Sequence, residues 1–281
     1  MKDRIASVIV GQEQTVDLVL TAILANGHVL IEGVPGVAKT LLARLTARLI
    51  DADFSRVQFT PDLMPSDVLG TTVFNMKTNG FDFHQGPIFA DIVLVDEINR
   101  APAKTQAALF EVMEERQISI DGTTHRMGDL YTILATQNPV EQEGTYKLPE
   151  AQLDRFLMKI TMDYPSLEEE VSILERHHTN AALVKLEDVH PVITRDELLA
   201  FRKLMDKVFV DRTLLQYIAL IVQQTRTSKA VYLGASPRAS VAMLQSSKAY
   251  ALLQGRDFVT PEDIKFCLLY TSDAADDLLC V

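Results

Sequence analysis

The sequence contains no tryptophan and only two cysteines, Cys267 and Cys280, both near its carboxyl end. The preceding chain therefore has neither a disulfide framework nor a zinc site built on cysteine. No apolar run approaches the ~18 residues that a membrane-spanning helix needs. The start, MKDRIASVIVGQ, follows its charges with only a few apolar residues, which does not fit an export signal. These absences predict a cytoplasmic protein without membrane insertion.

Basic charge is also scarce. The 281 residues include 27 lysines and arginines against 38 aspartates and glutamates, for a formal net charge of −11. Binding to a nucleic-acid backbone relies on Lys and Arg displacing counterions, so this balance makes nucleic acid a poor candidate partner, although a local basic patch stays compatible with it. The composition, 47% apolar and 23% charged, is that of a globular protein with a sizeable core.

The first part of the chain alternates short apolar runs with helical patterns. The apolar runs at 28–32, 56–60, 91–97 and 131–138 predict strands, and segments such as APAKTQAALFEVMEER predict helices. Strands that alternate with helices indicate an α/β fold with a mainly parallel sheet covered by helices. Two hairpins are expected to project from it, with two-residue turns at Asn79-Gly80 and Asp121-Gly122.

Beyond about residue 165 the pattern is helical throughout. Thr194 with Glu197 forms a capping box, Ser236 and Pro237 open another helix, and Gly255 ends it. We therefore predict an α/β core at 1–163 and a small all-helical domain at 164–269. Residues 270–281, YTSDAADDLLCV, contain no basic residue and form an atypical tail, either disordered or foreign to the natural chain.

The string GVPGVAKT at 33–40 nearly matches the phosphate-binding pattern G-x-x-x-x-G-K-[ST], with Ala38 in place of a glycine. Such a loop points backbone N–H groups at a phosphate, while Lys39 reaches the β and γ oxygens and the Thr40 hydroxyl binds Mg²⁺. A methyl group at position 38 is tolerated if its φ is negative. The alternative is a glycine-rich turn between a strand and a helix.

A second motif favours the nucleotide site. Asp96 and Glu97 follow the buried run IVLV, at the carboxyl end of a strand, where α/β sheets bind ligands. Asp96 is suited to hold the Mg²⁺ shell and Glu97 to polarise the attacking water. Acidic residues also end strands for solubility, but these two follow the loop by 56 residues on a strand of the expected type.

With these motifs the chain resembles the AAA+ ATPases, and among them the MoxR group, from Val10 to about Asp263. The strings that carry the resemblance are EGVPGVAKT, LVDEINRAPAKTQAALFEVMEERQ, LATQNPVEQEGTYKLPEAQLDRF and GASPRA. The resemblance implies a P-loop core with a helical lid, and it implies that ATP and Mg²⁺ are bound. It also implies that alanine at position 38 is common in this group. The family pattern fails at the carboxyl end, where more helical residues are expected after PEDIK.

The resemblance also assigns roles to single residues. Asn138 is similar to the sensor that contacts the γ-phosphate or its attacking water, although an Asn-Pro turn is the alternative. Arg155 resembles the arginine finger that reaches a neighbouring subunit's nucleotide. Arg238 resembles the second sensor, which contacts the γ-phosphate in cis; positive charge at a helix N-terminus is otherwise unfavourable. The expected nucleotide-binding residues are Gly11, Gln12, Gly33, Val34, Pro35, Gly36, Val37, Ala38, Lys39, Thr40 and Leu41.

An arginine finger that acts in trans implies a ring, expected to be a hexamer, with ATP at each subunit boundary. The hairpin at about 71–86 corresponds to an insertion that faces the ring's substrate side, with an ordinary edge hairpin as the alternative. The expected function is that of an ATP-driven, chaperone-like remodeller, which assists maturation or metal-cofactor insertion of a client protein, with a von Willebrand factor A domain protein as partner.

Two other functions stay open at the level of sequence. One is an AAA+ nucleic-acid motor, which salt-dependent DNA binding would distinguish from the remodeller. The other is a nucleotide-gated binding switch with little turnover, which a measurement of ATP hydrolysis would separate from both.

Overall fold

The computed structural model describes residues 1–34, 36–138, 145–146, 148–178, 186–229, 231 and 234–271. Its centre is a five-stranded sheet in the order β2-β5-β8-β1-β9, in which every neighbouring pair is parallel. The strands are β1 (Val29–Gly33), β2 (Phe54–Gln58), β5 (Ile92–Asp96), β8 (Thr132–Gln137) and β9 (Met158–Met162). The predicted parallel sheet is confirmed.

Alternate residues of the central strands bury opposite faces of this sheet. Ile92 and Leu94 of β5 join a cluster with α2 (Glu13–Leu24) and α3 (Lys39–Leu49), whereas Val93 and Val95 join a cluster with α5 (Ala103–Glu115). Both faces are thus covered by helices, which explains why β5 is an unbroken apolar run up to its last residue. Among the described residues up to 163, the other α-helices are α1 (Lys2–Ala6), α4 (Pro65–Leu69) and α6 (Glu150–Leu153), and η1 (Ile98–Arg100) is a short 3-10 helix.

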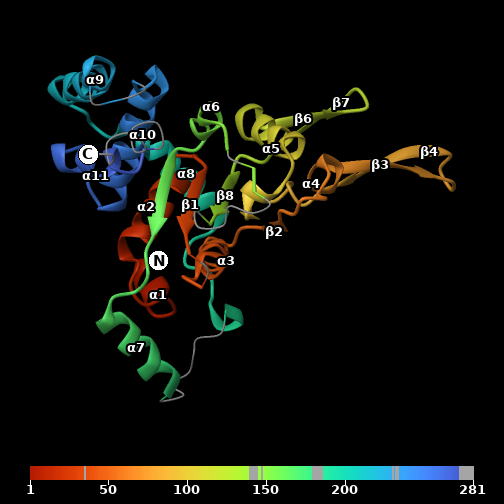
Figure 1. Cartoon of the computed structure of the whole chain (residues 1–281), viewed down its shortest axis with the longest axis horizontal. Helices are drawn as coiled ribbons and strands as arrows, with labels where there is room; N and C mark the ends of the chain where they lie inside the picture. The colour runs from red at the N-terminus through yellow and green to blue at the C-terminus, as the bar shows by residue number, and fades with distance from the viewer. Residues whose placement is uncertain are drawn as a thin grey trace.

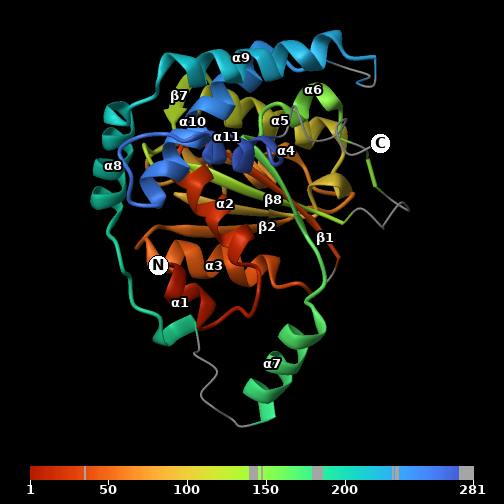
Figure 2. The same ribbon diagram turned by 90° about the vertical axis from the view of Figure 1, so that its left-hand side faces the viewer.

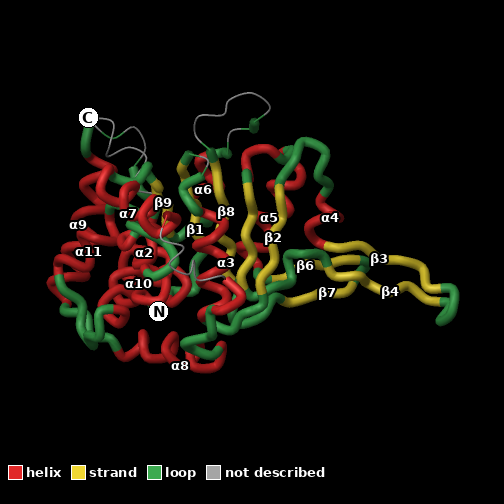
Figure 3. Tube along the Cα trace, turned by 90° about the horizontal axis from the view of Figure 1, so that it is seen from below, coloured by secondary structure: helices red, strands yellow, loops and turns green. Residues whose placement is uncertain are grey.

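Two antiparallel hairpins project from the sheet in the same direction (Figures 1 and 3). They are β3 (Gly70–Asn75) with β4 (Gly80–Gln85), and β6 (Gln117–Ile120) with β7 (Thr123–Arg126). The second has the predicted two-residue turn, with Asp121 and Gly122 both at positive φ. The prediction for the first turn is wrong in length, because Asn75 pairs with Gly80 and residues 76–79 lie between the strands.

Rings from both hairpins meet near the body of the molecule. The ring centroid of His125, on β7, lies 4.3 Å from that of Phe83, on β4, and 6.3 Å from that of Phe89. The two hairpins therefore pack on one another at their bases, while the turn of the longer one extends beyond them (Figure 1).

The described part after residue 163 is helical, apart from two isolated β-bridges. Its α-helices are α7 (Leu167–His178), α8 (Arg195–Leu204), α9 (Arg212–Thr227), α10 (Pro237–Leu253) and α11 (Pro261–Leu268). The predicted Thr194/Glu197 capping box and the Ser236 cap are present, and Gly255 has a positive φ just after α10. In Figure 2, α9, α10 and α11 lie together above the sheet and α7 extends below it.

The helical part and the α/β part share a core. Helix α10 packs on α2, and the buried Ala249 belongs to the same cluster as the residues of α2 and α3. The side chain of Arg202, on α8, donates to the carbonyl of Ile23 at the end of α2. The domain limits at 163 and 269 stay predictions. Of the atypical tail, Tyr270 and Thr271 pack on the body, and 272–281 lie outside the described residues.

Candidate nucleotide-binding site

The loop between β1 and α3 has the geometry of a phosphate loop. Gly33, at the end of β1, lies so close to β9 that an added Cβ would come within 2.8 Å of the Met162 carbonyl oxygen. Gly36 has a φ of 90°, which favours glycine. Pro35 lies outside the described residues. The loop ends at α3, whose first residue is Lys39, so the loop leads into a helix N-terminus, the end of a helix that favours anions.

The expectation for Ala38 is wrong. This residue is the N-cap of α3 and has a φ of 64°, in the left-handed region, rather than a negative φ. The chain must reverse its direction within the loop before entering the helix, and at this position the reversal requires a conformation that costs an alanine roughly 1–2 kcal/mol. The small side chain is accommodated, but not for the reason that the sequence suggested.

The predicted metal-binding and catalytic side chains converge beside this loop. Lys39 extends its ammonium group to the Gly33 carbonyl, and the Thr40 Oγ1 lies 3.4 Å from Asp96 Oδ2. Because β5 and β8 are paired with Val95 opposite Ala135, Asn138 emerges at the same sheet edge as Asp96 and Glu97. The Asn138 side chain is 7% exposed. The sheet thus gathers Thr40, Asp96, Glu97 and Asn138 where the sequence predicts a nucleotide site.

Asp96 is fixed by partners that the sequence motif does not reveal. Its Oδ1 accepts a hydrogen bond of 2.5 Å from the hydroxyl of Thr136 on β8. Its Oδ2 accepts two hydrogen bonds from the guanidinium of Arg56 on β2, at 3.1 and 2.7 Å. Asp96 is nearly buried, so a partner of opposite charge offsets its desolvation.

Glu97 is held by a second set of contacts. Its backbone has a φ of 57°, and its N–H donates to the same Thr136 hydroxyl at 3.0 Å. Its carboxylate accepts from Gln58 Nε2 at 2.7 Å and lies 3.0 Å from Arg100 Nε. Gln58 Oε1 in turn accepts from Arg56 at 3.0 Å. One chain of hydrogen bonds therefore joins the two carboxylates through β2.

An apolar cavity of about 260 Å³ opens beside the phosphate loop. Its walls come from the segment before α2, the phosphate loop, the start of α3 and helix α7. The lining residues are Val8, Ile9, Val10, Gln12, Gly36, Val37, Ala38, Leu41, Pro165, Ile173 and Arg176. Of the expected nucleotide-binding residues that the structure describes, five are absent from this lining: Gly11, Gly33, Val34, Lys39 and Thr40.

Helix α7 contributes residues to this cavity that the sequence did not suggest. Ile173 and Arg176 line it, and Arg176 donates to the backbone carbonyls of Ala6 and Ser7. Gln12 has a φ of 63° and donates to the Asp163 carbonyl at 3.3 Å. An amphipathic helix pattern predicts that α7 exists, but it cannot predict which distant segment the helix covers.

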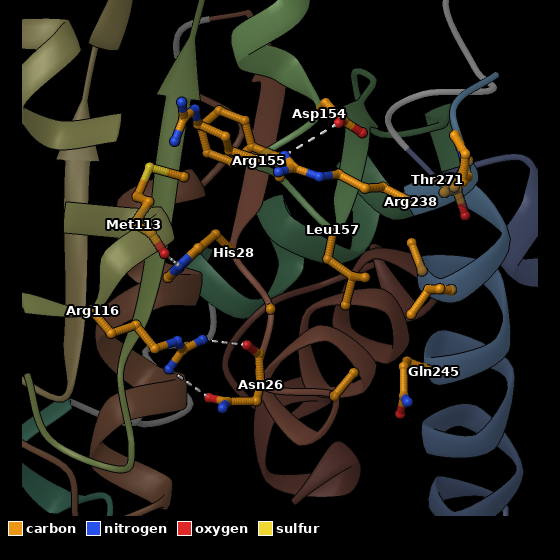
Figure 4. A pocket seen from close by; sticks show the side chains of 17 residues that line it. Asn26, His28, Met113, Arg116, Asp154, Arg155, Leu157, Arg238, Gln245 and Thr271 are labelled. Carbon is orange, nitrogen blue, oxygen red and sulfur yellow. Dashed lines mark hydrogen bonds and ion pairs between the residues drawn. The ribbon is translucent and has the colours of Figure 1, made fainter. Parts of the chain in front are cut away.

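Arg155 and Arg238 lie elsewhere, in a groove of about 520 Å³ that also contains Gly27 and His28, the residues just before β1 (Figure 4). Both arginines pair with Glu114 in the last turn of α5, and Arg238 Nη1 also lies 3.6 Å from Asp154 Oδ2. Five residues of a strand span about 16 Å. The groove and the phosphate loop are therefore at opposite ends of β1.

This placement corrects the expected cis contact of Arg238. The guanidinium is held beside Arg155 by carboxylates at the far end of the sheet, because α10 packs on α2 and begins next to the end of α5. Within one chain, Arg238 does not reach the phosphate loop. The structure brings the two arginines together and separates both from the other predicted site residues.

His28, in the floor of the groove, is structural. Its Nδ1 accepts from the Ile133 N–H at 3.0 Å, and its Nε2 lies 3.2 Å from the Met113 carbonyl (Figure 4). Burial, with a smaller contribution from the charge of Arg116, lowers the pKa of His28 to about 3. The imidazole is therefore neutral near pH 7, and Nε2 carries the proton that it donates to Met113.

Comparisons with known proteins agree with this geometry. The ATPase family associated with various cellular activities (AAA) matches residues 28–158, and the AAA lid domain matches residues 223–271. The fold is thus that of an AAA ATPase with a lid.

Two relatives identify the group, and one solved structure agrees with the fold. Chaperone MoxR1 of Mycobacterium tuberculosis is 45% identical over 266 residues, which cover 92% of this chain and 69% of that protein. Protein MoxR of Methylorubrum extorquens is 30% identical over 93% of this chain and 82% of its own length. The crystal structure of a candidate ATPase from Cytophaga hutchinsonii superposes with a TM-score of 0.87 at 40% identity, covering 96% of this chain and 84% of that one.

The chain belongs to the MoxR group of AAA ATPases. It binds nucleotide and hydrolyses ATP, and its function is chaperone-like in the general sense of that group. Within the part of the chain that is described, no helix has both the length and the apolar character needed to cross a membrane.

Proposed function

We propose that the protein is an ATP-driven remodeller of client proteins that works as a ring, expected to be a hexamer, with one ATP at each boundary between copies. The observation that carries this proposal is the separation of the site into two parts at opposite ends of β1. The phosphate loop and the acidic pair form one part, and Arg155 with Arg238 forms the other. A second copy placed head to tail would join the two parts.

In this proposal the adenine occupies the apolar cavity beside Gln12 and Leu41, and the phosphates lie on the loop at the N-terminus of α3. Lys39 turns from the Gly33 carbonyl to the β- and γ-phosphates. Such a loop supplies the N–H donors, and the lysine supplies the charge.

The hydroxyl of Thr40 and the carboxylate of Asp96 fit a Mg²⁺ ion that accompanies ATP. They are oxygen donors, which Mg²⁺ prefers, and they face each other across 3.4 Å. When bound, the ion would neutralise charge on the β- and γ-phosphates. Glu97 orients the attacking water and accepts its proton, and Asn138 fixes the γ-phosphate or that water through its amide.

The arginines act on the next copy's nucleotide. As the bond to the γ-phosphoryl group breaks, negative charge develops on the phosphate oxygens, and guanidinium groups that are already in place stabilise it. We assign this role to Arg155 and Arg238 together, in trans. Both residues were predicted from the sequence to be catalytic, and both remain so in this proposal. The difference is that Arg238 now acts on the nucleotide of the neighbouring copy instead of its own.

The client contact is proposed to lie on the hairpin of β3 and β4, which extends farthest from the body (Figure 1). The side chains of Met76 and Phe81, near its turn, are 87% and 74% exposed, and Phe74 contacts Phe81 edge to face. Exposed apolar side chains of this kind favour a protein partner over a nucleic-acid backbone. As the MoxR resemblance implies, the work is client maturation or metal-cofactor insertion, with a von Willebrand factor A domain protein as partner.

The test is ATP hydrolysis measured over a range of protein concentrations, together with the mass of the particle in ATP. Specific activity should rise as a ring forms, because each site needs an arginine from another copy. Full activity in a particle with the mass of one chain would contradict the proposal.

A further inference from the structure

Glu114 is the side chain that links the two arginines. One carboxylate oxygen, Oε2, pairs with Arg155 Nη1, and the other, Oε1, accepts from Arg238 Nη2 at 2.9 Å. Arg155 comes from the segment after α6 and Arg238 from the first turn of α10. One carboxylate therefore joins the helical part to the end of the sheet. No sequence motif predicts a role for Glu114.

Electrostatics explains why such a link is needed. Two guanidinium groups that share one groove repel each other, and Arg238 also lies at a helix N-terminus, where positive charge is unfavourable. The hydrogen bond from Arg238 and the charge of Arg155 lower the pKa of Glu114, which therefore stays ionised near neutral pH. The carboxylates of Glu114 and Asp154 together balance the two positive charges of Arg155 and Arg238.

Glu114 is anchored more firmly than the side chains that it holds. It lies in the last turn of α5, between the buried Val112 and Met113 and the helix end, and the Met113 carbonyl is bonded to His28, the residue just before β1. The Arg238 side chain is 64% exposed, and among the described residues its guanidinium pairs with the carboxylates of Glu114 and Asp154. The position of its guanidinium therefore depends on Glu114.

We infer that Glu114 is a positioning residue for ATP hydrolysis, which holds Arg155 and Arg238 side by side so that both meet the nucleotide bound to the next copy of this chain. The inference rests on the proposed shared site. Glu114 itself touches no nucleotide. Arg155 Nη1 also donates to the Phe110 carbonyl at 3.0 Å, so Glu114 chiefly sets the position of Arg238 relative to Arg155.

The first test is the steady-state kinetics of Glu114→Ala and Glu114→Gln. Misplacement of a reacting group by 1 Å can lower a rate about 100-fold, so kcat should fall between about tenfold and 100-fold. The KM for ATP and the ring mass should stay unchanged, because the adenine cavity and the phosphate loop bind the ground-state nucleotide, whereas the arginines are proposed to stabilise charge that develops as the bond breaks. Glu114→Gln keeps the side-chain volume, and it provides a readout if the alanine variant folds poorly.

A matched control is Glu115→Gln. Glu115 is the next residue of α5, is exposed, and makes no ion pair or hydrogen bond among the described residues. Its substitution removes the same charge from the same helix end, and kcat should stay at the wild-type value. An equal loss in both variants would show a general charge effect and would overturn the inference.

The second test mixes copies. Glu97→Gln copies cannot hydrolyse their own ATP but keep both arginines and Glu114, so in mixed rings they should restore hydrolysis at neighbouring Glu114→Ala sites. Arg155→Ala copies are mixed with Glu97→Gln copies in the same way. Because Arg155→Ala leaves Glu114 intact, hydrolysis restored in this mixture tests the shared site without testing the role of Glu114.

The outcomes distinguish the role of Glu114 from the proposal of a nucleotide site shared between copies. If mixing restores Arg155→Ala but Glu114→Ala has a wild-type kcat, or gains nothing from mixing, only the role of Glu114 is overturned. If neither variant gains from mixing, the shared site itself is wrong, and the role of Glu114 falls with it.

Discussion

The hydroxyl of Thr136 offers a quantitative test of how the acidic pair is fixed. This side chain is 1% exposed, donates to Asp96 Oδ1 at 2.5 Å and accepts from the Glu97 N–H at 3.0 Å. Thr136→Val keeps the shape and removes both bonds. A bond to a charged acceptor contributes about 1.5–3 kcal/mol, and a buried N–H left without a partner costs about 1–3 kcal/mol. Together these two contributions predict that the free energy of unfolding falls by about 2.5–6 kcal/mol.

Urea unfolding followed by circular dichroism measures this change from the shift of the transition midpoint at constant slope. Thr136→Ser is the control, because it keeps the hydroxyl and loses only a buried methyl group, which contributes about 0.8 kcal/mol. ATP turnover should fall in the valine variant as well, since the left-handed backbone at Glu97 loses its hydrogen bond. A valine variant that is as stable and as active as the serine variant would show that the Thr136 hydroxyl does not fix Asp96 and Glu97.

Three further predictions concern the loop, the lysine and the groove. Ala38→Gly should raise the free energy of unfolding by up to about 1 kcal/mol in the same urea assay, because glycine adopts a positive φ without strain; a less stable variant would contradict the geometry of the loop. Lys39→Ala should lose ATP binding in calorimetry, since the loop loses the side-chain charge assigned to the phosphates, and unchanged affinity would remove that role. The third concerns pH. The folded-state pKa of His28, about 3, lies below its unfolded value of 6.5. The stability that neutral His28 contributes is therefore present above pH 6.5 and is lost as the pH falls toward 3, by about 1.4 kcal/mol per unit in this window. His28→Gln should show a shallower loss over the same range, and an equal slope would contradict the assignment.

The elements of the fold could be predicted because their signals are local. Apolar runs such as that of β5, the Asp121-Gly122 turn and the Thr194 capping box each lie within a few consecutive residues, and the structure contains all three. The phosphate loop and the acidic pair were predictable for a related reason. Each motif is contiguous, and parallel strands bring their carboxyl ends to one edge of the sheet.

The contacts between distant segments could not be predicted. Arg56 and Gln58 reach Asp96 and Glu97 only because β2 is the neighbour of β5, and no local pattern sets that strand order. Arg238 was assigned to the wrong side because its place depends on how α10 packs against α2. The φ of Ala38 likewise follows from the path of the loop rather than from the residue type.

The central claim is that one nucleotide site is built from two copies of the chain. Its most direct test is the ATP turnover of Arg155→Ala and Glu97→Gln proteins, each alone and then mixed at constant total concentration. We expect little turnover from either protein alone and clear turnover from the mixture, because an intact phosphate site of one copy then meets the intact arginines of the other. A mixture no more active than the sum of its parts, in rings shown by mass to contain both proteins, would contradict it.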